Sequence, residues 1–293
     1  MRKKKFQPRR VLASAVPTAV TIILFVAGLL FCLPIFAVIL GSLKSDRELM
    51  NALIAALGDG QGTVQWHLLP LYPTAKHFVN LLFYTPEFFT VFWNSMKIAA
   101  LILLGQLFVA IPAAWGFAKF SFRGKNALFL SYVILMLMPF GVMMLPSYLV
   151  LNKIHLMNTH WAVILPAVFS TFPVFLMYRG FCAIPKDLYE AAKIDGAGEW
   201  QIFFRIGIPL GSPGILSALV LGFLEYWNMI EQPLAFLSDP SLWPLSLYLP
   251  EINILKAGMA LAASVITLMP AVFVFFMGQD YLEQGIVSSG MKE

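Results

Sequence analysis

Long apolar runs, rather than alternating or helical stripes, dominate the pattern of this chain. A bilayer core about 30 Å thick takes roughly 20 apolar residues of helix. Six stretches reach that length, near residues 15–41, 94–116, 127–150, 161–181, 210–230 and 258–279. The pattern therefore predicts an all-α membrane protein with six transmembrane helices. The membrane domain is expected over residues 15–280, between terminal tails at 1–14 and 281–293.

Composition supports the membrane assignment. Of the 293 residues, 59% are hydrophobic and 12% are charged, about half the charged share of a typical soluble domain. The formal net charge of +5 does not indicate nucleic-acid binding, because basic residues gather just before the first apolar run, between Arg2 and Arg10. No basic stripe is spread among polar residues, and no nucleic-acid partner is expected.

Lysine and arginine also predict the topology. Fourteen of the 20 fall in the N-terminal tail, between spans two and three, between spans four and five, or at the C-terminus. Cytoplasmic segments carry this excess. The chain is therefore expected to be a multi-pass protein of the plasma membrane with both termini in the cytoplasm. Residues 44–92 then form a long external loop, which could dock an extracellular partner or merely cap the helices. Residues 183–209 form a cytoplasmic loop.

The cytoplasmic loop 183–209 reads as two short helices joined by a turn. Pro185 suits a helix start, and the next nine residues are good helix formers. Gly196 and Gly198 break that helix and permit a left-handed conformation. A second amphipathic helix, with Trp200 and Phe203 on its apolar side, is expected to end at Pro209, where the fifth span begins. The apolar side must be covered by the lipid interface, the chain's own bundle or a partner's groove.

The residues at fixed spacing in this loop carry a family resemblance. Glu190 precedes two alanines, Gly196 follows it by six positions, and Ile206 and Ile208 precede Pro209. This pattern resembles the EAA loop of binding-protein-dependent ABC permeases. The Trp93-Asn94-Ser95 start of span two and the segment 114–125 are similar to the carbohydrate branch, in particular to its maltose-permease-like six-span subunits.

The resemblance implies a type I ABC importer permease that forms half of a translocation pathway in a bacterial inner membrane, with a sugar or oligosaccharide as substrate. The implied partners are a second homologous permease subunit, a cytoplasmic ATPase dimer, an extracellular substrate-binding protein and membrane lipid. The loop would sit in a cleft of the ATPase, where Glu190 meets a basic residue. The residues implied in this coupling are Glu190, Ala191, Ala192, Asp195, Gly196, Ile206 and Pro209.

The chain is not expected to be an enzyme or to hold a cofactor. It has no Gly-x4-Gly-Lys-Ser/Thr loop, so ATP would be hydrolysed by the partner subunits. No catalytic constellation and no metal-ligand pattern stands out among its few carboxylates and four histidines. Two other classes stay open: an ABC-coupled sensor or efflux component that shares the permease fold, and, with less support, a membrane-embedded enzyme.

One polar cluster lies near the external end of span five. A carboxylate within a membrane is costly and is a functional candidate for that reason. The four consecutive residues Glu225, Tyr226, Trp227 and Asn228 combine a charge, an amide and flat rings, and we predict that they line the substrate pathway. The alternative is an aromatic belt at the membrane interface. Many sugar permeases of this branch lack such a glutamate, so a cationic or modified glycan is a second possible substrate.

Overall fold

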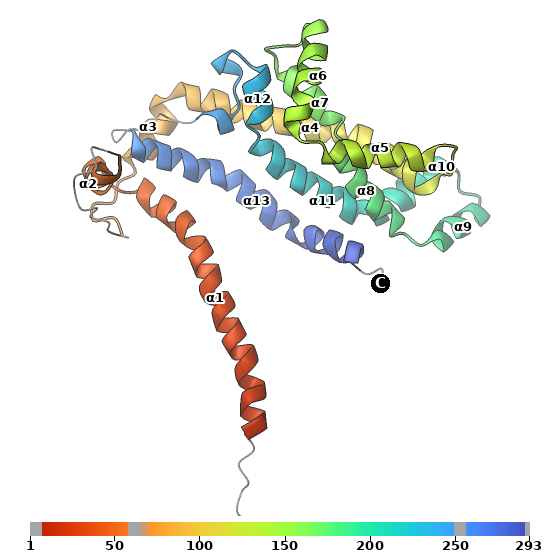
Figure 1. The fold of residues 1–293 in the computed structure, drawn as a ribbon, viewed down its shortest axis with the longest axis horizontal. Helices are drawn as coiled ribbons and strands as arrows, with labels where there is room; N and C mark the ends of the chain where they lie inside the picture. The colour runs from red at the N-terminus through yellow and green to blue at the C-terminus, as the bar shows by residue number, and fades with distance from the viewer. Residues whose placement is uncertain (1–7, 58–66, 68, 249–255, 291–293) are drawn as a thin grey trace, which may run out of the picture. The chain divides into compact units, whose positions relative to one another are not determined.

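A computed structural model describes residues 8–57, 67, 69–248 and 256–290. Within this part the chain is helical and contains no strand (Figure 1). It forms two compact units, residues 1–81 with 250–266 and residues 82–249 with 267–293. The α-helices are α1 (Pro8–Ser42), α2 (Asp46–Leu57), α3 (Lys76–Tyr84), α4 (Pro86–Lys119), α5 (Lys125–Leu137), α6 (Phe140–Lys153), α7 (His160–Val168), α8 (Thr171–Cys182), α9 (Lys186–Ile194), α10 (Glu199–Ile202), α11 (Ile208–Trp227), α12 (Glu231–Phe236) and α13 (Ala257–Gly290).

The all-α fold with several apolar spans is confirmed. Five helical segments in the described part are long and apolar enough to cross a membrane, and a bent pair of helices brings the number to six. The five are Val20–Ser42, Pro86–Lys119, His160–Cys182, Glu199–Trp227 and Ala257–Leu282. Each contains or overlaps one predicted span, because uninterrupted apolar length determines which segments can cross a bilayer.

The third span is not the single helix that the apolar run 127–150 suggests. Helices α5 and α6 meet at an angle of 103°. Met138 leaves the helical region with φ −73° and ψ 127°, and Pro139 is extended with ψ 147°. Proline disfavours a helical conformation in the residue before it, so Pro139 ends α5 at this point.

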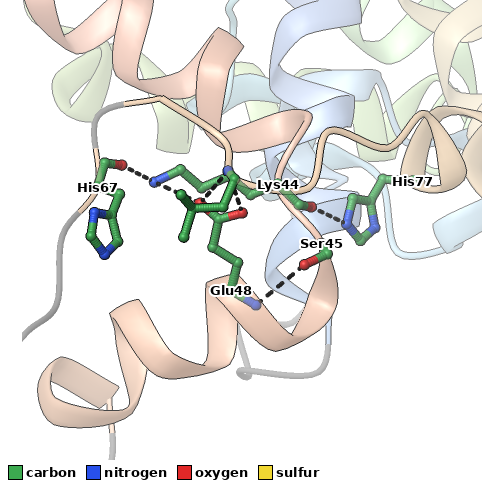
Figure 2. Close-up of polar contacts among 6 residues, drawn as sticks. Lys44, Ser45, Glu48, His67 and His77 are labelled. Atoms are coloured by element: carbon green, nitrogen blue, oxygen red, sulfur yellow. Dashed lines mark hydrogen bonds and ion pairs between the residues drawn. The ribbon is translucent and has the colours of Figure 1, made fainter.

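A buried ion pair organises the first unit around the start of α2 (Figure 2). Lys44 is only 4% exposed, and its Nζ lies 3.8 Å from Glu48 Oε1 and donates to the carbonyl of His67. Glu48 Oε2 accepts the N–H of Leu71 at 3.2 Å, and His77 Nε2 lies 3.0 Å from the Lys44 carbonyl oxygen. Buried charges are stable only when paired and hydrogen-bonded. The first part of the loop expected at 44–92 is therefore structured around these contacts.

Helices α4, α8 and α11 pack together at the centre of the second unit. Their shared core includes Trp115 of α4, Met177 and Phe181 of α8, and Ile215 of α11. It continues into the cytoplasmic loop of the predicted topology through Tyr189 of α9. The core of the bundle thus extends directly into the segment that carries the family resemblance.

Two glycines allow α8 and α11 to touch along their backbones. A Cβ atom on Gly214 would lie 2.8 Å from the Cα of Gly180, closer than side-chain carbons approach backbone atoms. Small residues at helix interfaces permit this close approach in membranes, where association depends on packing. The pair fixes the spacing of the two central helices.

Replacing Gly214 with alanine is expected to lower the free energy of unfolding by about 1–3 kcal/mol, the usual cost of overpacking. The measurement is the thermal unfolding midpoint of the detergent-solubilised chain. Gly116→Ala is the matched control, because a Cβ there meets no atom within 4 Å. An unchanged midpoint for Gly214→Ala would contradict a tight α8–α11 contact.

Candidate functional site

Helix α9 and the turn after it have the form predicted for a glycine-turned helix pair. Gly196 adopts φ +81°, a left-handed conformation that glycine takes at little cost. The N–H of Ala197 donates to the carbonyl of Ala192 at 2.9 Å, and the N–H of Gly196 donates to that of Lys193 at 3.1 Å. These are the bonds of a glycine-ended helix terminus. The turn therefore depends on the glycine at position 196.

The second half of the loop differs from the prediction. Helix α10 does not end before span five, because a π-helical segment, Phe203–Gly207, joins it directly to α11. In this segment the N–H of Ile208 donates to the carbonyl of Phe203, five residues back. The wider turn accommodates Pro209, whose missing N–H would otherwise interrupt a regular helix. Residues Glu199–Trp227 thus form one continuous helical rod that reaches from the turn through the fifth span.

The chain's own bundle covers part of the apolar side of the loop. Tyr189 of α9 is 5% exposed and lies edge-on to Trp115, with 5.6 Å between ring centroids. Lys119 Nζ lies 3.5 Å from the centroid of the Tyr189 ring. Burial raises the pKa of Tyr189 to about 12, so its hydroxyl stays protonated at physiological pH. Tyr189 therefore attaches α9 to the end of α4 as a neutral packing residue.

Other apolar side chains of the loop are left uncovered by the described chain. Ile194 is 86% exposed and Trp200 is 75% exposed, and the Trp200 ring stacks on the exposed Phe204 at 6.1 Å. Charges flank them, with an ion pair between Lys193 and Glu199 across the turn. An apolar patch with a charged rim is characteristic of a protein-binding or a membrane-binding surface.

The predicted coupling residues fall into two groups around this patch. Glu190, Ala191, Asp195 and Gly196 are exposed on α9 and its turn, and Pro209 is exposed on α11. Ala192 and Ile206 are half-buried and pack against the bundle core. The first group is available to a partner, whereas the second attaches the loop to the spans. Their coupling roles remain predictions.

A cavity of about 540 Å³ lies in the second unit where several helices are interrupted. Its lining includes Met138 at the α5–α6 break and Phe169 and Ser170 at the break between α7 and α8. At membrane depth, non-helical backbone is tolerated only where it is buried in protein or lines a water-filled space. The breaks of two separate spans therefore meet at one cavity among the helices, where such backbone is tolerated.

The four residues of the polar cluster of span five do not all line this cavity. Glu225 and Tyr226 line it, and the Tyr226 hydroxyl accepts a hydrogen bond from Gln106 Nε2 at 2.6 Å. Trp227 is 1% exposed, stacks on Phe223 and donates its indole N–H to the Thr267 carbonyl at 3.0 Å. Asn228 donates to the Leu224 carbonyl at the end of α11. The structure thus brings only Glu225 and Tyr226 to the cavity, and the other two stabilise the end of the helix.

The cavity also contains polar residues that the sequence analysis did not single out. Ser147, Thr171 and Gln232 line it beside four phenylalanines, and no lysine, arginine or histidine is among its lining residues. The buried Gln232 Oε1 accepts no hydrogen bond from the described residues. In the sequence these residues are visible only as polar positions within or beside apolar runs. Which of them line the same cavity becomes clear only from the folded structure. Within the described part, no group of three His, Cys, Asp or Glu side chains could hold a metal ion.

Comparisons with known proteins place the chain in one family. Residues 106–288 match the model of the binding-protein-dependent transport system inner membrane component. The arabinooligosaccharides transport system permease protein AraQ is similar in two species. The protein of Halalkalibacterium halodurans is 31% identical over 88% of this chain and 90% of that protein. The Bacillus subtilis protein is 30% identical over 94% of this chain and 95% of that protein.

A solved structure has the same fold. In a bacterial ABC transporter involved in the import of the acidic polysaccharide alginate, one chain matches with a TM-score of 0.77 and 20% identity, over 95% of this chain and 99% of that chain. The family match includes α9, the glycine turn and the cavity-lining end of α11. The chain therefore belongs to the family of binding-protein-dependent transport system inner membrane components.

Proposed function

We propose that this chain forms half of the translocation pathway of an ATP-driven importer for a sugar or oligosaccharide. The observation that carries the proposal is the glycine-turned α9 with its exposed Glu190, which leads into a helical rod through the fifth span. The relatives support the substrate class, because their names refer to transport of arabinooligosaccharides, lactose and diacetylchitobiose.

The coupling role belongs to α9 and the turn. We infer that the patch of Ile194, Trp200 and Phe204 fills a groove in a separate ATPase subunit, while Glu190 pairs with a basic residue there. ATP would be hydrolysed entirely on that partner. Because α10 and α11 are continuous, a displacement of α10 would carry the fifth span with it, as in rigid-body gating.

The proposed orientation places both termini and α9 in the cytoplasm, by the excess of basic residues on that side. The opposite side would receive substrate from an extracellular binding protein. A solved alginate transporter of similar fold contains an alginate-bound periplasmic protein. A second permease subunit, either a related chain or another copy, would complete the pathway.

The cavity at Glu225 is the proposed place where the sugar passes through this chain. Its aromatic rings can pack on the apolar face of a sugar, and its carboxylate, amide and hydroxyl groups can exchange hydrogen bonds with sugar hydroxyls. Among the described residues, Glu225 is the only charged one that lines the cavity. A neutral or amine-bearing glycan therefore fits this space, whereas a uronic acid would face an uncompensated negative charge.

Reconstitution tests the function. The chain is placed in proteoliposomes together with its proposed second permease, ATPase and binding protein, and is supplied with arabinotriose, lactose, diacetylchitobiose or an alginate trisaccharide. We expect ATP-dependent accumulation of at least one of the first three sugars. Extrusion from loaded vesicles instead would support the efflux alternative, and sugar-stimulated ATPase without movement of any sugar would support a sensor.

A further inference from the structure

Trp115 of α4 contacts the proposed coupling helix α9, the neighbouring helix α8 and the π-helical segment before α11. It lies near the cytoplasmic end of α4 in the proposed topology and is 6% exposed. Its ring centroid lies 5.4 Å from that of Phe181 on α8, 5.6 Å from Tyr189 on α9 and 5.4 Å from Phe203 in the π-helical segment. One side chain therefore joins α4, α8, α9 and the root of α11.

The same ring lies directly against backbone. A Cβ atom on Gly207, the last residue of the π-helical segment, would lie 2.5 Å from Cζ3 and 2.9 Å from Cη2 of Trp115. Only a residue without a side chain leaves room for the indole there. Single π-turns within α-helices are frequent at functional sites, and this one lies where the loop becomes the fifth span. Trp115 therefore packs against the junction between them.

The other contacts that hold the turn in place are weaker. Lys193 and Glu199 form an ion pair in which both side chains are about half exposed, and such surface pairs contribute little. Lys119 over the Tyr189 ring is a single cation–π contact. A buried ring with edge-on aromatic neighbours is much less free to shift, because close-packed interiors transmit displacement.

We infer that Trp115 is a positioning residue that makes the loop, α4 and the base of α11 move as one body. This inference rests on the proposed function of α9 as the ATPase-coupling element. Without the indole, α9 could follow the ATPase while α10 and the fifth span stayed behind. ATP hydrolysis would then continue without proportionate transport.

The first test is the stoichiometry of the reconstituted complex. In Trp115→Leu we expect binding-protein-stimulated ATPase to persist while sugar accumulated per ATP falls by ~tenfold, within the range typical of coupling between sites. Trp93→Leu is the matched control, because Trp93 lies on the same helix and is 61% exposed. A wild-type ratio of sugar to ATP in Trp115→Leu would overturn the inference.

A double-mutant cycle separates this contact from general destabilisation. Gly207→Ala places a methyl group against Cζ3 and Cη2, and it is expected to reduce transport per ATP. Trp115→Phe removes those two atoms, so the double variant should transport more per ATP than Gly207→Ala alone. Additive losses would exclude the proposed ring–backbone contact. If Trp115→Leu fails to assemble, this cycle decides the question.

A distance measurement tests rigid movement directly and needs no sugar. Spin labels are attached at Asp187→Cys on α9 and Leu210→Cys on α11, both exposed positions, with the two native cysteines replaced by serine. With Trp115 present, the label distance should be unchanged when the ATPase dimer is trapped with ATP and vanadate. In Trp115→Leu it should change or broaden, and an unchanged distance would overturn the inference. The proposed function is tested separately, by sugar uptake in the reconstituted wild-type complex and by the loss of uptake expected in Glu190→Ala and Gly196→Pro.

Discussion

Replacing Glu190 with alanine is expected to reduce sugar accumulation to background while the chain still inserts and assembles with its second permease. Glu190 is exposed on α9 and is not one of the described core residues of the bundle. Its loss should therefore leave the fold intact and remove a charge offered to the ATPase. Losing one partner of an interfacial charge pair typically costs 2–5 kcal/mol, or about 30-fold or more in affinity. The measurement is co-purification of the ATPase together with uptake in proteoliposomes.

Asp187→Ala is the matched control for this prediction. Asp187 lies on the same short helix, is exposed and is also a carboxylate, but it is not part of the spaced pattern. It should retain most of the uptake. Gly196→Pro tests the backbone of the same site, because proline cannot adopt φ +81°. Normal uptake in both Glu190→Ala and Gly196→Pro would exclude this segment as the coupling element.

The spans and the turn could be predicted because each depends on local chemistry. Apolar length selects the membrane helices, and a glycine six residues after Glu190 permits the left-handed turn seen at Gly196. The angle at Pro139 could not be predicted, since a proline ends a helix without fixing the direction of the next one. Nor could the continuity through Pro209, which depends on a π-turn five residues long.

The cavity and the Trp115 contact were beyond sequence reasoning for a different reason. Trp115 and Gly207 are far apart in the chain and meet only because α4 packs on α11. The cavity collects breaks from separate spans, and its polar residues are scattered singly through apolar segments. Four consecutive residues, Glu225 to Asn228, were predicted to line the substrate pathway, and that role stays a prediction. Of the four, Glu225 and Tyr226 line the cavity, because neighbours along a helix point about 100° apart.

The second large effect on transport is expected at Glu225, which lines the cavity. Glu225→Gln keeps the size of the side chain and removes its charge. Hydrogen bonds to a charged group contribute roughly 1.5–3 kcal/mol against about 0.5–1.5 for neutral ones. We therefore expect the KM for the transported neutral sugar to rise by about tenfold, measured as initial uptake rate against external sugar concentration. Glu231→Gln is the matched control, since Glu231 is exposed on α12 and does not line the cavity.

Glu225→Lys extends the test from affinity to selectivity. It replaces the carboxylate of the cavity with a charge of opposite sign, so uptake of the neutral sugar should fall further than in the glutamine variant. We expect the wild-type cavity to disfavour a uronic acid because of like-charge repulsion, and the lysine would remove that barrier. Alginate trisaccharide should then stimulate the ATPase of the variant complex. The trisaccharide is supplied at millimolar concentration without the binding protein, because the binding protein would otherwise select the substrate. If both Glu225 variants keep wild-type KM and selectivity, the sugar does not pass beside Glu225. The cavity would then be a hydrated packing defect at the helix breaks.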